Sequence, residues 1–422
     1  MYANPPDSQV VRRLVRTFPA SDLQERADTV ELRQRHRKLD PVAFFWTLVF
    51  GFAAGHDRTI QALLDRYLAT ADEDALAYNS FSNWFSPALL TFLRELLEEQ
   101  LEGFEPRHDQ LAGRLARFRD VLIADGTFVT LVQSAADVFP AFREDHAGCK
   151  VQLTESLARG LPTRFEVTDA HTHDRSALQS GRWVEDALVL LDLGFYDFWL
   201  FDRIDANGGF FVTRLKTDAN PLLVEELRTW RGNAIPLKGK HLQDVVDDRY
   251  RDVIDVRAAV SFQRRAYRGS RSMATKCFRL VGLWNDDEDR YHLYLTNLDA
   301  ETFDAGEIGL LYRARWEVEW TFKVLKSWFR LDDLRVSNPV IIEALLLVAA
   351  LSLVVSRVIL DELRELETQP LPTDDTEADN DDENEPEESV RERLSRRRGS
   401  LAVQRFGGLI HQIGRASCRE RV

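Results

Sequence analysis

The chain has 422 residues, a formal net charge of −14 and three widely separated cysteines, Cys149, Cys277 and Cys418. This length is enough for two or three domains with a large core, and the cysteine usage excludes a disulfide-stapled secreted fold and favours a reducing compartment. No basic segment followed by an apolar core and a cleavage site opens the chain, so we expect no signal peptide.

Residues 1–112 are predicted to form a helical N-terminal domain, because their apolar side chains recur at helical spacing. The densest apolar run, Phe44–Phe50, is expected to be a buried helix that is too short to span a bilayer. The basic segment Arg33–Lys38 precedes it, and two interpretations stay open. The segment is either a solvated helix face or a contact for nucleic-acid phosphates.

A sheet is expected next, and two of its strands carry an isolated aspartate. The predicted strands lie near residues 120–131, 150–157, 163–168, 187–191 and 210–215. Asp125 interrupts the first of them and is followed by Gly126, whereas Asp192 ends the fourth, where α/β sheets place their ligand sites. An ionised carboxylate in so apolar a strand is costly unless it is paired or bound to a metal. Taken singly, each aspartate also fits a strand-end cap or an ion pair.

Other acidic and histidine residues between these strands are weaker candidates. The stretch His171-Thr172-His173-Asp174 suggests a metal site, but no cysteine or histidine partner follows at zinc-like spacing, so we expect a loop. Further acids near the second aspartate are expected on the outward face of a helix: Asp197, Asp202 and Asp205.

A β-rich insertion is predicted over residues 217–305. Alternating segments at 252–267, 277–284 and 290–298 indicate its strands. Four arginines at the first of its turns are either contacts for a nucleic-acid backbone or exposed hairpin charges. They are Arg264, Arg265, Arg268 and Arg271.

The most specific pattern lies in the segment YRARWEVEWTFKVLK. Tyr312, Arg315, Glu319 and Lys326 are separated by three, four and seven residues, steps that return to one face of an α-helix. A carboxylate between two fixed cations suits a metal ion held beside a phosphate. The alternative is a solvated helix face with an Arg–Glu pair four residues apart.

The C-terminal region is predicted to consist of four successive segments. Residues 336–367 are expected to form a helix that packs on the sheet domain and does not enter a membrane. Residues 368–389 read as an acidic disordered linker, and 390–412 as a C-terminal segment. Residues 413–422 resemble a translated sequencing adapter and are interpreted as an artefact.

Together, the two aspartates and the Tyr-x2-Arg-x3-Glu-x6-Lys spacing resemble the DDE transposases of bacterial and archaeal insertion sequences. The similarity is strongest to the insertion sequence 4 family and covers roughly Leu115–Arg335. It implies an α/β fold: an RNase H-like catalytic domain at 113–335, with a mixed sheet flanked by helices, that carries the β-rich insertion. The acidic composition also resembles haloarchaeal transposases, for which high salt screens long-range repulsion from DNA.

The resemblance implies a metal-dependent chemistry on DNA. Two Mg²⁺ ions, with Mn²⁺ as a substitute, would be held by a bridging Asp125, by Asp192 and by Glu319. Arg315 and Lys326 would hold phosphates near the cut end.

The resemblance also implies partners and a setting. Tyr312 would contact a phosphate or sugar of double-stranded DNA, which comprises the inverted repeats of a mobile element and a target. A homodimer in the synaptic complex and a cytoplasmic, nucleoid-associated prokaryotic setting complete the expectation. An RNase H-like nuclease without strand transfer, and a domesticated or inactive DNA-binding derivative, are the alternatives.

Overall fold

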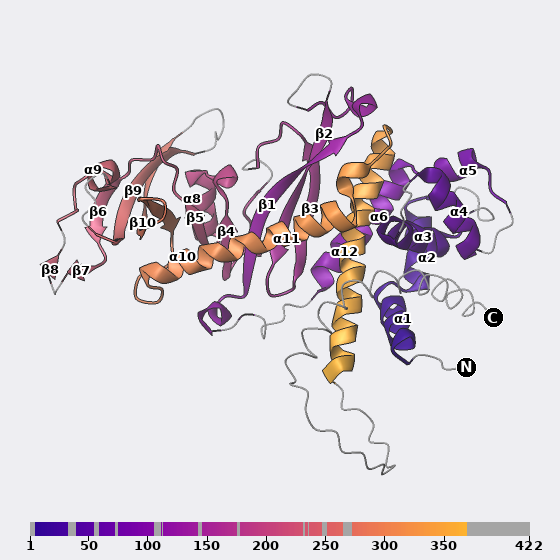
Figure 1. Ribbon diagram of the computed structural model, residues 1–422, viewed down its shortest axis with the longest axis horizontal. Helices are drawn as coiled ribbons and strands as arrows, with labels where there is room; N and C mark the ends of the chain where they lie inside the picture. Colours follow the sequence, from indigo (N-terminus) through magenta and orange to yellow (C-terminus); the bar gives the residue numbers. More distant parts are fainter. Residues whose placement is uncertain are drawn as a thin grey trace, which may run out of the picture. The chain divides into compact units, whose positions relative to one another are not determined.

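Figure 1 shows the computed structural model and the arrangement of its helices and strands. It describes residues 5–32, 39–54, 59–71, 75–104, 111, 113–141, 146–174, 178–230, 233–234, 236–246, 251–264 and 272–368. The basic segment 33–38, most of the basic turn (265–271) and all predicted segments beyond residue 368 lie outside these ranges. The chain forms two compact units: Met1–Gln100, Leu131–Val138 and Leu325–Val422 in the first, and Leu101–Thr130 and Phe139–Val324 in the second. The domain boundaries expected from the sequence stay predictions.

The first unit is helical, which confirms the expected helical N-terminal region. Its helices are α1 (Pro5–Thr17), α2 (Ala20–Thr29), α3 (Pro41–Ala54), α4 (Ile60–Ala71), α5 (Tyr78–Ser82), α6 (Pro87–Gly103) and α12 (Pro339–Thr368). Asp40 caps α3, because its carboxylate accepts from the N–H groups of Val42 and Ala43 at 3.0 and 3.3 Å. Phe44 then packs edge-on against Phe81 at a ring distance of 5.6 Å. Aromatic burial therefore holds this bundle together.

The long helix α12 confirms the helix expected over residues 336–367, and its expected packing on the sheet domain stays a prediction. By length and composition it is apolar enough to cross a membrane over Pro339–Glu365, with a mean hydropathy of 2.4. However, 78% of its most apolar window is buried inside the structure, and core helices of water-soluble folds pass the same test. It packs on α1 and α3, where the Ser352 hydroxyl donates to the Val49 carbonyl at 3.2 Å.

The second unit is built on one mixed sheet. Within the described residues, nine strands follow the order β3-β2-β1-β4-β5-β11-β10-β9-β6. The first five are β1 (Asp120–Leu131), β2 (Ala147–Ser156), β3 (Leu161–Asp169), β4 (Ala187–Leu191) and β5 (Phe210–Arg214). Strands β1, β4 and β5 are parallel, and β2 is antiparallel to β3. This arrangement confirms the expected α/β class with an RNase H-like core.

The insertion continues this sheet instead of forming a separate one. Its strands are β6 (Leu222–Glu226), β9 (Val253–Gln263), β10 (Met273–Asn285) and β11 (Arg290–Thr296), with the small pair β7 (Thr229–Trp230) and β8 (Asn233–Ala234) and helix α9 (Leu242–Val246). Strand β11 pairs antiparallel with β5, so that Leu295 lies opposite Thr213. The pairing satisfies the backbone groups that β5 would otherwise expose at a sheet edge.

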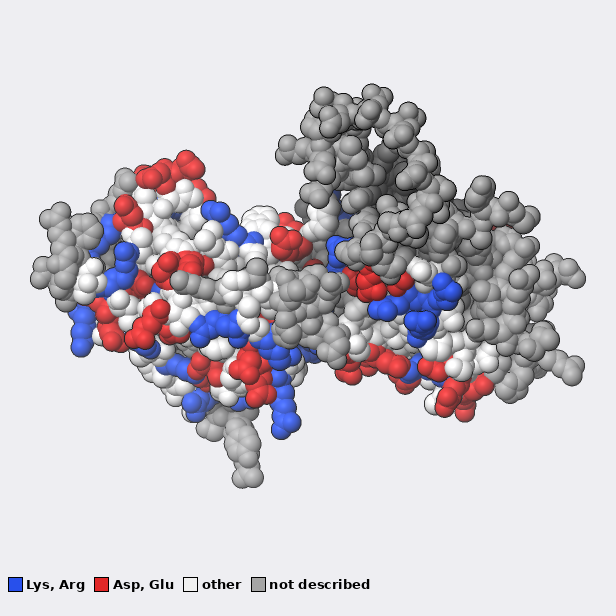
Figure 2. All heavy atoms as spheres, turned by 90° about the horizontal axis from the view of Figure 1, so that it is seen from below, with Lys and Arg blue, Asp and Glu red and all other residues white. Residues whose placement is uncertain are grey.

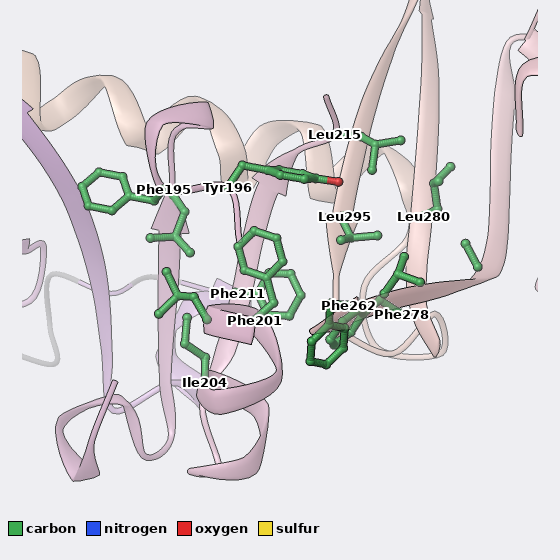
Figure 3. Close-up of a cluster of buried hydrophobic side chains, with 14 of the residues drawn as sticks. Phe195, Tyr196, Phe201, Ile204, Phe211, Leu215, Phe262, Phe278, Leu280 and Leu295 are labelled. Carbon is green, nitrogen blue, oxygen red and sulfur yellow. The ribbon is translucent and has the colours of Figure 1, made fainter. Parts of the chain in front are cut away.

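One apolar core joins the catalytic strands to the insertion (Figure 3). Phe201 of helix α8 (Phe198–Ala206) stacks on Phe211 of β5 at 4.8 Å, and Phe211 meets Phe278 of β10 edge-on at 5.2 Å. Because these rings are fully buried, the insertion is fixed to the strands that carry the aspartates.

Candidate active site

The parallel pairing of β1 and β4 brings the two predicted aspartates together. In the register of this pair, Ala124 lies opposite Leu191. Asp125 and Asp192 follow these two residues directly, so they stand at the same level on neighbouring strands. The Gly126 N–H donates to Asp125 Oδ1 at 2.8 Å and orients this carboxylate.

The helical stretch that carries Glu319 is not one regular α-helix. Helix α10 (Ala305–Arg313) is followed by the 3₁₀ turn η6 (Ala314–Trp316), by α11 (Glu317–Lys323) and by the π turn η7 (Val324–Trp328). The signature residues therefore do not share the single regular helical face that their spacing predicts. Irregular turns of this kind are frequent at functional sites.

Arg315 connects two of the three carboxylates. Its Nη1 donates to Asp125 Oδ2 and its Nη2 donates to Glu319 Oε1, both at 3.2 Å. The Arg315 side chain is only 9% exposed, and the guanidinium also lies 5.1 Å from the ring centre of Trp316. The Arg–Glu pair expected four residues apart is therefore present, and it extends to the first aspartate.

The electrostatics of Asp125 show that the other two carboxylates act on it. Burial raises the pKa of Asp125 to about 6, although the Gly126 N–H and the Arg315 guanidinium oppose the increase. The charges of Asp192 and Glu319 raise it further. A site in which anions repel one another in this way favours a cation.

This donor set fits a divalent metal ion. Carboxylate oxygens are the ligands that Mg²⁺ prefers, and Mg²⁺ retains several waters, so few protein ligands are needed. Among the described residues, no three His, Cys, Asp or Glu side chains lie close enough together to hold a metal ion as they stand. Instead, the guanidinium of Arg315 is the positive group between Asp125 and Glu319.

Tyr312 is buried next to these groups, with its ring 5.4 Å from that of Tyr294. Burial and the charge of Asp192 raise the pKa of its phenol to about 12, against the opposing effect of Arg315 and Arg214. The phenol therefore stays protonated at neutral pH and can donate a hydrogen bond.

A cavity of about 750 Å³ opens beside Asp192 and extends to the insertion. Arg214, at the C-terminal end of β5, lines it and was not singled out from the sequence. Its position at the end of the third parallel strand was the available signal. Polar and aromatic lining residues include Asp192, Arg214, Trp284, His292, Tyr312 and Arg315.

The remaining predicted cations are not placed with the carboxylates. Lys326 lies in η7 and belongs to the other compact unit, so its part in the site stays a prediction. Arg264 follows β9 and is exposed. The other arginines of the predicted basic turn lie outside the described residues, and their role also stays a prediction: Arg265, Arg268 and Arg271.

The other acids near Asp192 have partners of their own, and Asp202 and Asp205 pair with β10 instead of lying on an outward helix face as expected. Asp197 caps α8 by accepting from the Trp199 N–H at 2.9 Å. Asp202 and Asp205 both accept from Lys276 Nζ, the former at 2.9 Å. The partners on α8 and β10 satisfy these three carboxylates, so none of the three needs a metal ion as a partner.

A further buried carboxylate, Glu155 of β2, lies against α11 and was missed. Glu155 is 8% exposed and hydrogen-bonded to the Thr321 side chain. Burial raises the pKa of Glu155 to about 7, the hydrogen bond opposes this, and the charge of Glu317 adds to it. Because Thr321 follows Glu319 by two residues, this contact helps to seat the helix that carries Glu319.

The buried Glu155 makes stability depend on pH. Its pKa in the folded protein, about 7, exceeds the ordinary 4.5, so the folded state binds this proton more tightly. The free energy of unfolding should therefore fall as pH rises from about 4.5 to 7. Glu155→Gln should remove this pH-dependent decrease. Between pH 4 and pH 8, the free energy of unfolding of the variant should therefore rise by up to about 3 kcal/mol relative to that of the wild type. Urea unfolding at both pH values measures this difference.

The control for this experiment is Glu166→Gln, because the Glu166 side chain on β3 is 44% exposed. We expect this variant to follow the wild type within about 0.5 kcal/mol at both pH values. A pH profile of Glu155→Gln that parallels the wild type would contradict the account of Glu155.

An RNase H-like sheet with two level aspartates and a glutamate from a later helix defines the DDE class. The model of the transposase DDE domain family matches residues 116–355, more than half of the chain. The chain belongs to this family. Proteins of the family act on DNA by cleavage and strand transfer and generally use divalent metal ions.

Curated relatives are transposases of insertion sequences. The chain is 22% identical over 256 residues to the transposase for insertion sequence element IS231F of Bacillus thuringiensis subsp. israelensis, covering 52% of each chain. It is 24% identical over 257 residues to that of IS231E of Bacillus thuringiensis subsp. finitimus, covering 51% of each. For the transposase of IS1151 of Clostridium perfringens, identity is 22% over 283 residues, or 60% of this chain and 59% of the relative. The chain thus spans about half the length of the first two relatives.

Proposed function

We propose that this protein is a cut-and-paste transposase that cleaves DNA at the ends of its own mobile element and joins them to a target. The observation that carries the proposal is the level placement of Asp125 and Asp192 on parallel strands, connected to Glu319 through Arg315. The family membership supports the same reaction. The curated relatives named above are transposases of insertion sequence elements, which fits a mobile element as the substrate.

The three carboxylates would hold two Mg²⁺ ions, or Mn²⁺ in their place, with Asp125 shared between them. When bound, such ions stabilise the attacking and leaving oxygens of a phosphodiester. The charges of Asp192 and Glu319 both raise the pKa of Asp125, as expected if the three carboxylates share one metal site. Its partial burial keeps competing water away from one side of the site.

The cations of the site would hold the DNA backbone. Arg315 and Arg214 both line the cavity, and a guanidinium can bind phosphate oxygens through two parallel hydrogen bonds. The protonated phenol of Tyr312 adds a neutral donor to the same cavity. Lys326 is proposed to hold a further phosphate through its charge.

The partners follow from this reaction: double-stranded DNA with the inverted repeats of the element, target DNA, and a second copy of the chain in a synaptic homodimer. The proposed setting is the cytoplasm of a prokaryote. On the face drawn in Figure 2, Lys and Arg are interspersed with Asp and Glu. Local groups of arginines, such as those predicted at 264–271, would therefore make the phosphate contacts.

Arg315 should be needed to position DNA and not to bind metal. Arg315→Ala should bind Mn²⁺ at least as tightly as the wild type, since the guanidinium no longer pairs with Asp125 and Glu319. Losing a charged hydrogen bond to phosphate costs about 1.5–3 kcal/mol, so joining should slow about 10- to 100-fold. Arg315→Lys should recover little, because an ammonium cannot reproduce the guanidinium fork. Lys326→Arg should be tolerated better. Nicking, end processing and joining are scored separately on intact and pre-nicked ends.

An equal loss of nicking and of every later step in Arg315→Ala would contradict the positioning role. It would favour a purely structural bridge from Arg315 to Asp125 and Glu319.

The proposed DNA partner is tested by footprinting the chain on the genomic DNA that flanks its gene. We expect the footprint to protect a pair of inverted repeats. We also expect the DNA sequence just outside these repeats to carry a short target duplication. Binding without preference for these repeats would favour a nuclease that lacks strand transfer.

A further inference from the structure

The segment His171–Asp174, expected to be a loop, reaches β2 and the chain just after β4. Asp169 fixes its start, because Asp169 Oδ1 accepts from the His171 N–H at 2.9 Å and Oδ2 from the Thr172 hydroxyl at 2.8 Å. The carboxylate of Asp174 then lies inside the second compact unit, where its side chain is 26% exposed.

Two side chains of β2 hold Asp174 in place. Its Oδ1 accepts from Lys150 Nζ at 3.1 Å and from Gln152 Nε2 at 2.8 Å. Lys150 Nζ also donates to the Thr172 carbonyl at 2.9 Å, so it ties the incoming segment to β2. Gln152 is 6% exposed, and its amide is therefore fixed deep in the sheet.

Gln152 and Asp174 lie against two glycines, Gly126 and Gly194, which follow the proposed metal ligands Asp125 and Asp192. A Cβ atom at Gly126 would lie 2.6 Å from Gln152 Oε1 and 3.0 Å from its Cδ. A Cβ atom at Gly194 would lie 2.7 Å from Asp174 Oδ2. Real Cβ atoms essentially never lie closer than 3.0 Å to another heavy atom, so Gln152 Oε1 and Asp174 Oδ2 would have to shift to make room for a side chain at these glycines.

Gly126 follows Asp125 directly, and Gly194 follows Asp192 by two residues, with Leu193 between them. The backbone after both aspartates is thus packed against one hydrogen-bonded pair, Gln152 and Asp174. A shift of this pair would release both segments at once.

We propose that Asp174 is a positioning residue: together with Gln152 it fixes the backbone behind Asp125 and Asp192 and so sets the spacing of the proposed metal ligands. The inference rests on the metal-binding role proposed above for the two aspartates. Groups that orient metal ligands from behind typically contribute 10- to 100-fold to metal affinity. The alternative is that Asp174 only stabilises the fold through its ion pair with Lys150.

The test is Mn²⁺ binding to the full chain without DNA, followed by the loss of the electron paramagnetic resonance signal of free Mn²⁺. Asp174→Ala should raise the Kd about 10-fold. Asp202→Ala is the matched control, because Asp202 also accepts from a lysine, Lys276, at 2.9 Å, with similar side-chain exposures of 18% and 28%. The control should lose a similar amount of thermal stability and keep the wild-type Kd.

A double-substitution cycle tests the contact itself. Gly194→Ala alone should also raise the Kd, because its methyl group meets Asp174 Oδ2. In Asp174→Ala/Gly194→Ala the methyl group has room, so the Kd should be no higher than in Asp174→Ala alone. Asp174→Asn keeps an oxygen that can accept from Gln152, so it should raise the Kd for Mn²⁺ by less than Asp174→Ala does. This variant is measured instead if the alanine variant does not fold.

The positioning role would be overturned by equal Kd values for Asp174→Ala and Asp202→Ala, or by additive effects in the cycle. If the alanine variant does not fold, an unchanged Kd in Asp174→Asn would overturn it. Failure of the proposed function gives a different result. In that case wild type and Asp125→Asn would bind Mn²⁺ alike, and the inference would fall with the metal site itself.

Discussion

Asp125→Asn, Asp192→Asn and Glu319→Gln should each reduce metal-dependent DNA cleavage to background while leaving DNA binding largely intact. Each substitution keeps the size of the side chain and removes one anionic ligand from a site whose three carboxylates already influence one another. A loss of at least about 1000-fold corresponds to roughly 4 kcal/mol of transition-state stabilisation. Gel mobility shift and strand-resolved cleavage, performed in Mg²⁺ and in Ca²⁺, measure the two properties separately. Ca²⁺ should support binding better than cleavage, because its looser coordination positions the attacking oxygen poorly.

The control is Asp202→Asn, since Asp202 lies on α8 and pairs with Lys276. It should cleave at close to the wild-type rate. Retained cleavage in any one of the three site variants would remove that residue from the proposed metal site.

Asp255→Ala should destabilise the protein by about 3–5 kcal/mol, because it leaves Arg279 buried without its counter-charge. The two side chains are 4% and 3% exposed, and Arg279 Nε and Nη2 each donate to Asp255 at 2.8 Å. Arg279 Nη1 also donates to the carbonyls of Asp299 and Phe303, at 3.1 and 2.8 Å. The pair therefore ties β9 and β10 to the segment that leads into α10. Urea unfolding measures the change in free energy.

A surface ion pair of the same unit provides the comparison. Arg257 and Glu225 are 3.1 Å apart, with side chains 50% and 59% exposed, so Glu225→Ala should cost less than about 1 kcal/mol. The double variant Asp255→Leu/Arg279→Met should be more stable than Asp255→Ala, since no buried charge is left unpaired. Similar losses in Asp255→Ala and Glu225→Ala would show that the buried pair is not a principal contact of the insertion.

The strands and the first two site residues follow from local patterns in the sequence. Apolar runs with a single acid mark β1 and β4, and parallel pairing of two such strands brings their aspartates level. The expected helices of the N-terminal region and the strands of the insertion also rest on periodicity within short segments. These features are encoded by neighbouring residues, which explains why they can be predicted.

Contacts between distant segments could not be predicted in the same way. Spacing within the helix predicts the pair of Arg315 with Glu319, but the contact of Arg315 with Asp125 joins residues 190 positions apart. The 3₁₀ turn at Ala314–Trp316 likewise depends on how the helix packs. Asp174 appeared to belong to an ordinary loop because its partners, on β2, are more than 20 residues away.

In the proposed mechanism, the same three carboxylates serve both the cleavage and the joining of DNA ends. The most direct measurement is a strand-transfer assay with the purified chain, a labelled duplex that carries the flanking inverted repeat, and a supercoiled target. We expect labelled ends covalently joined to the target through their 3′ strand in Mg²⁺ or Mn²⁺, and no joined product with Asp125→Asn or in the presence of a chelator. Joined product that persists in Asp125→Asn, or cleavage by the wild type that never yields joined product, would contradict the account.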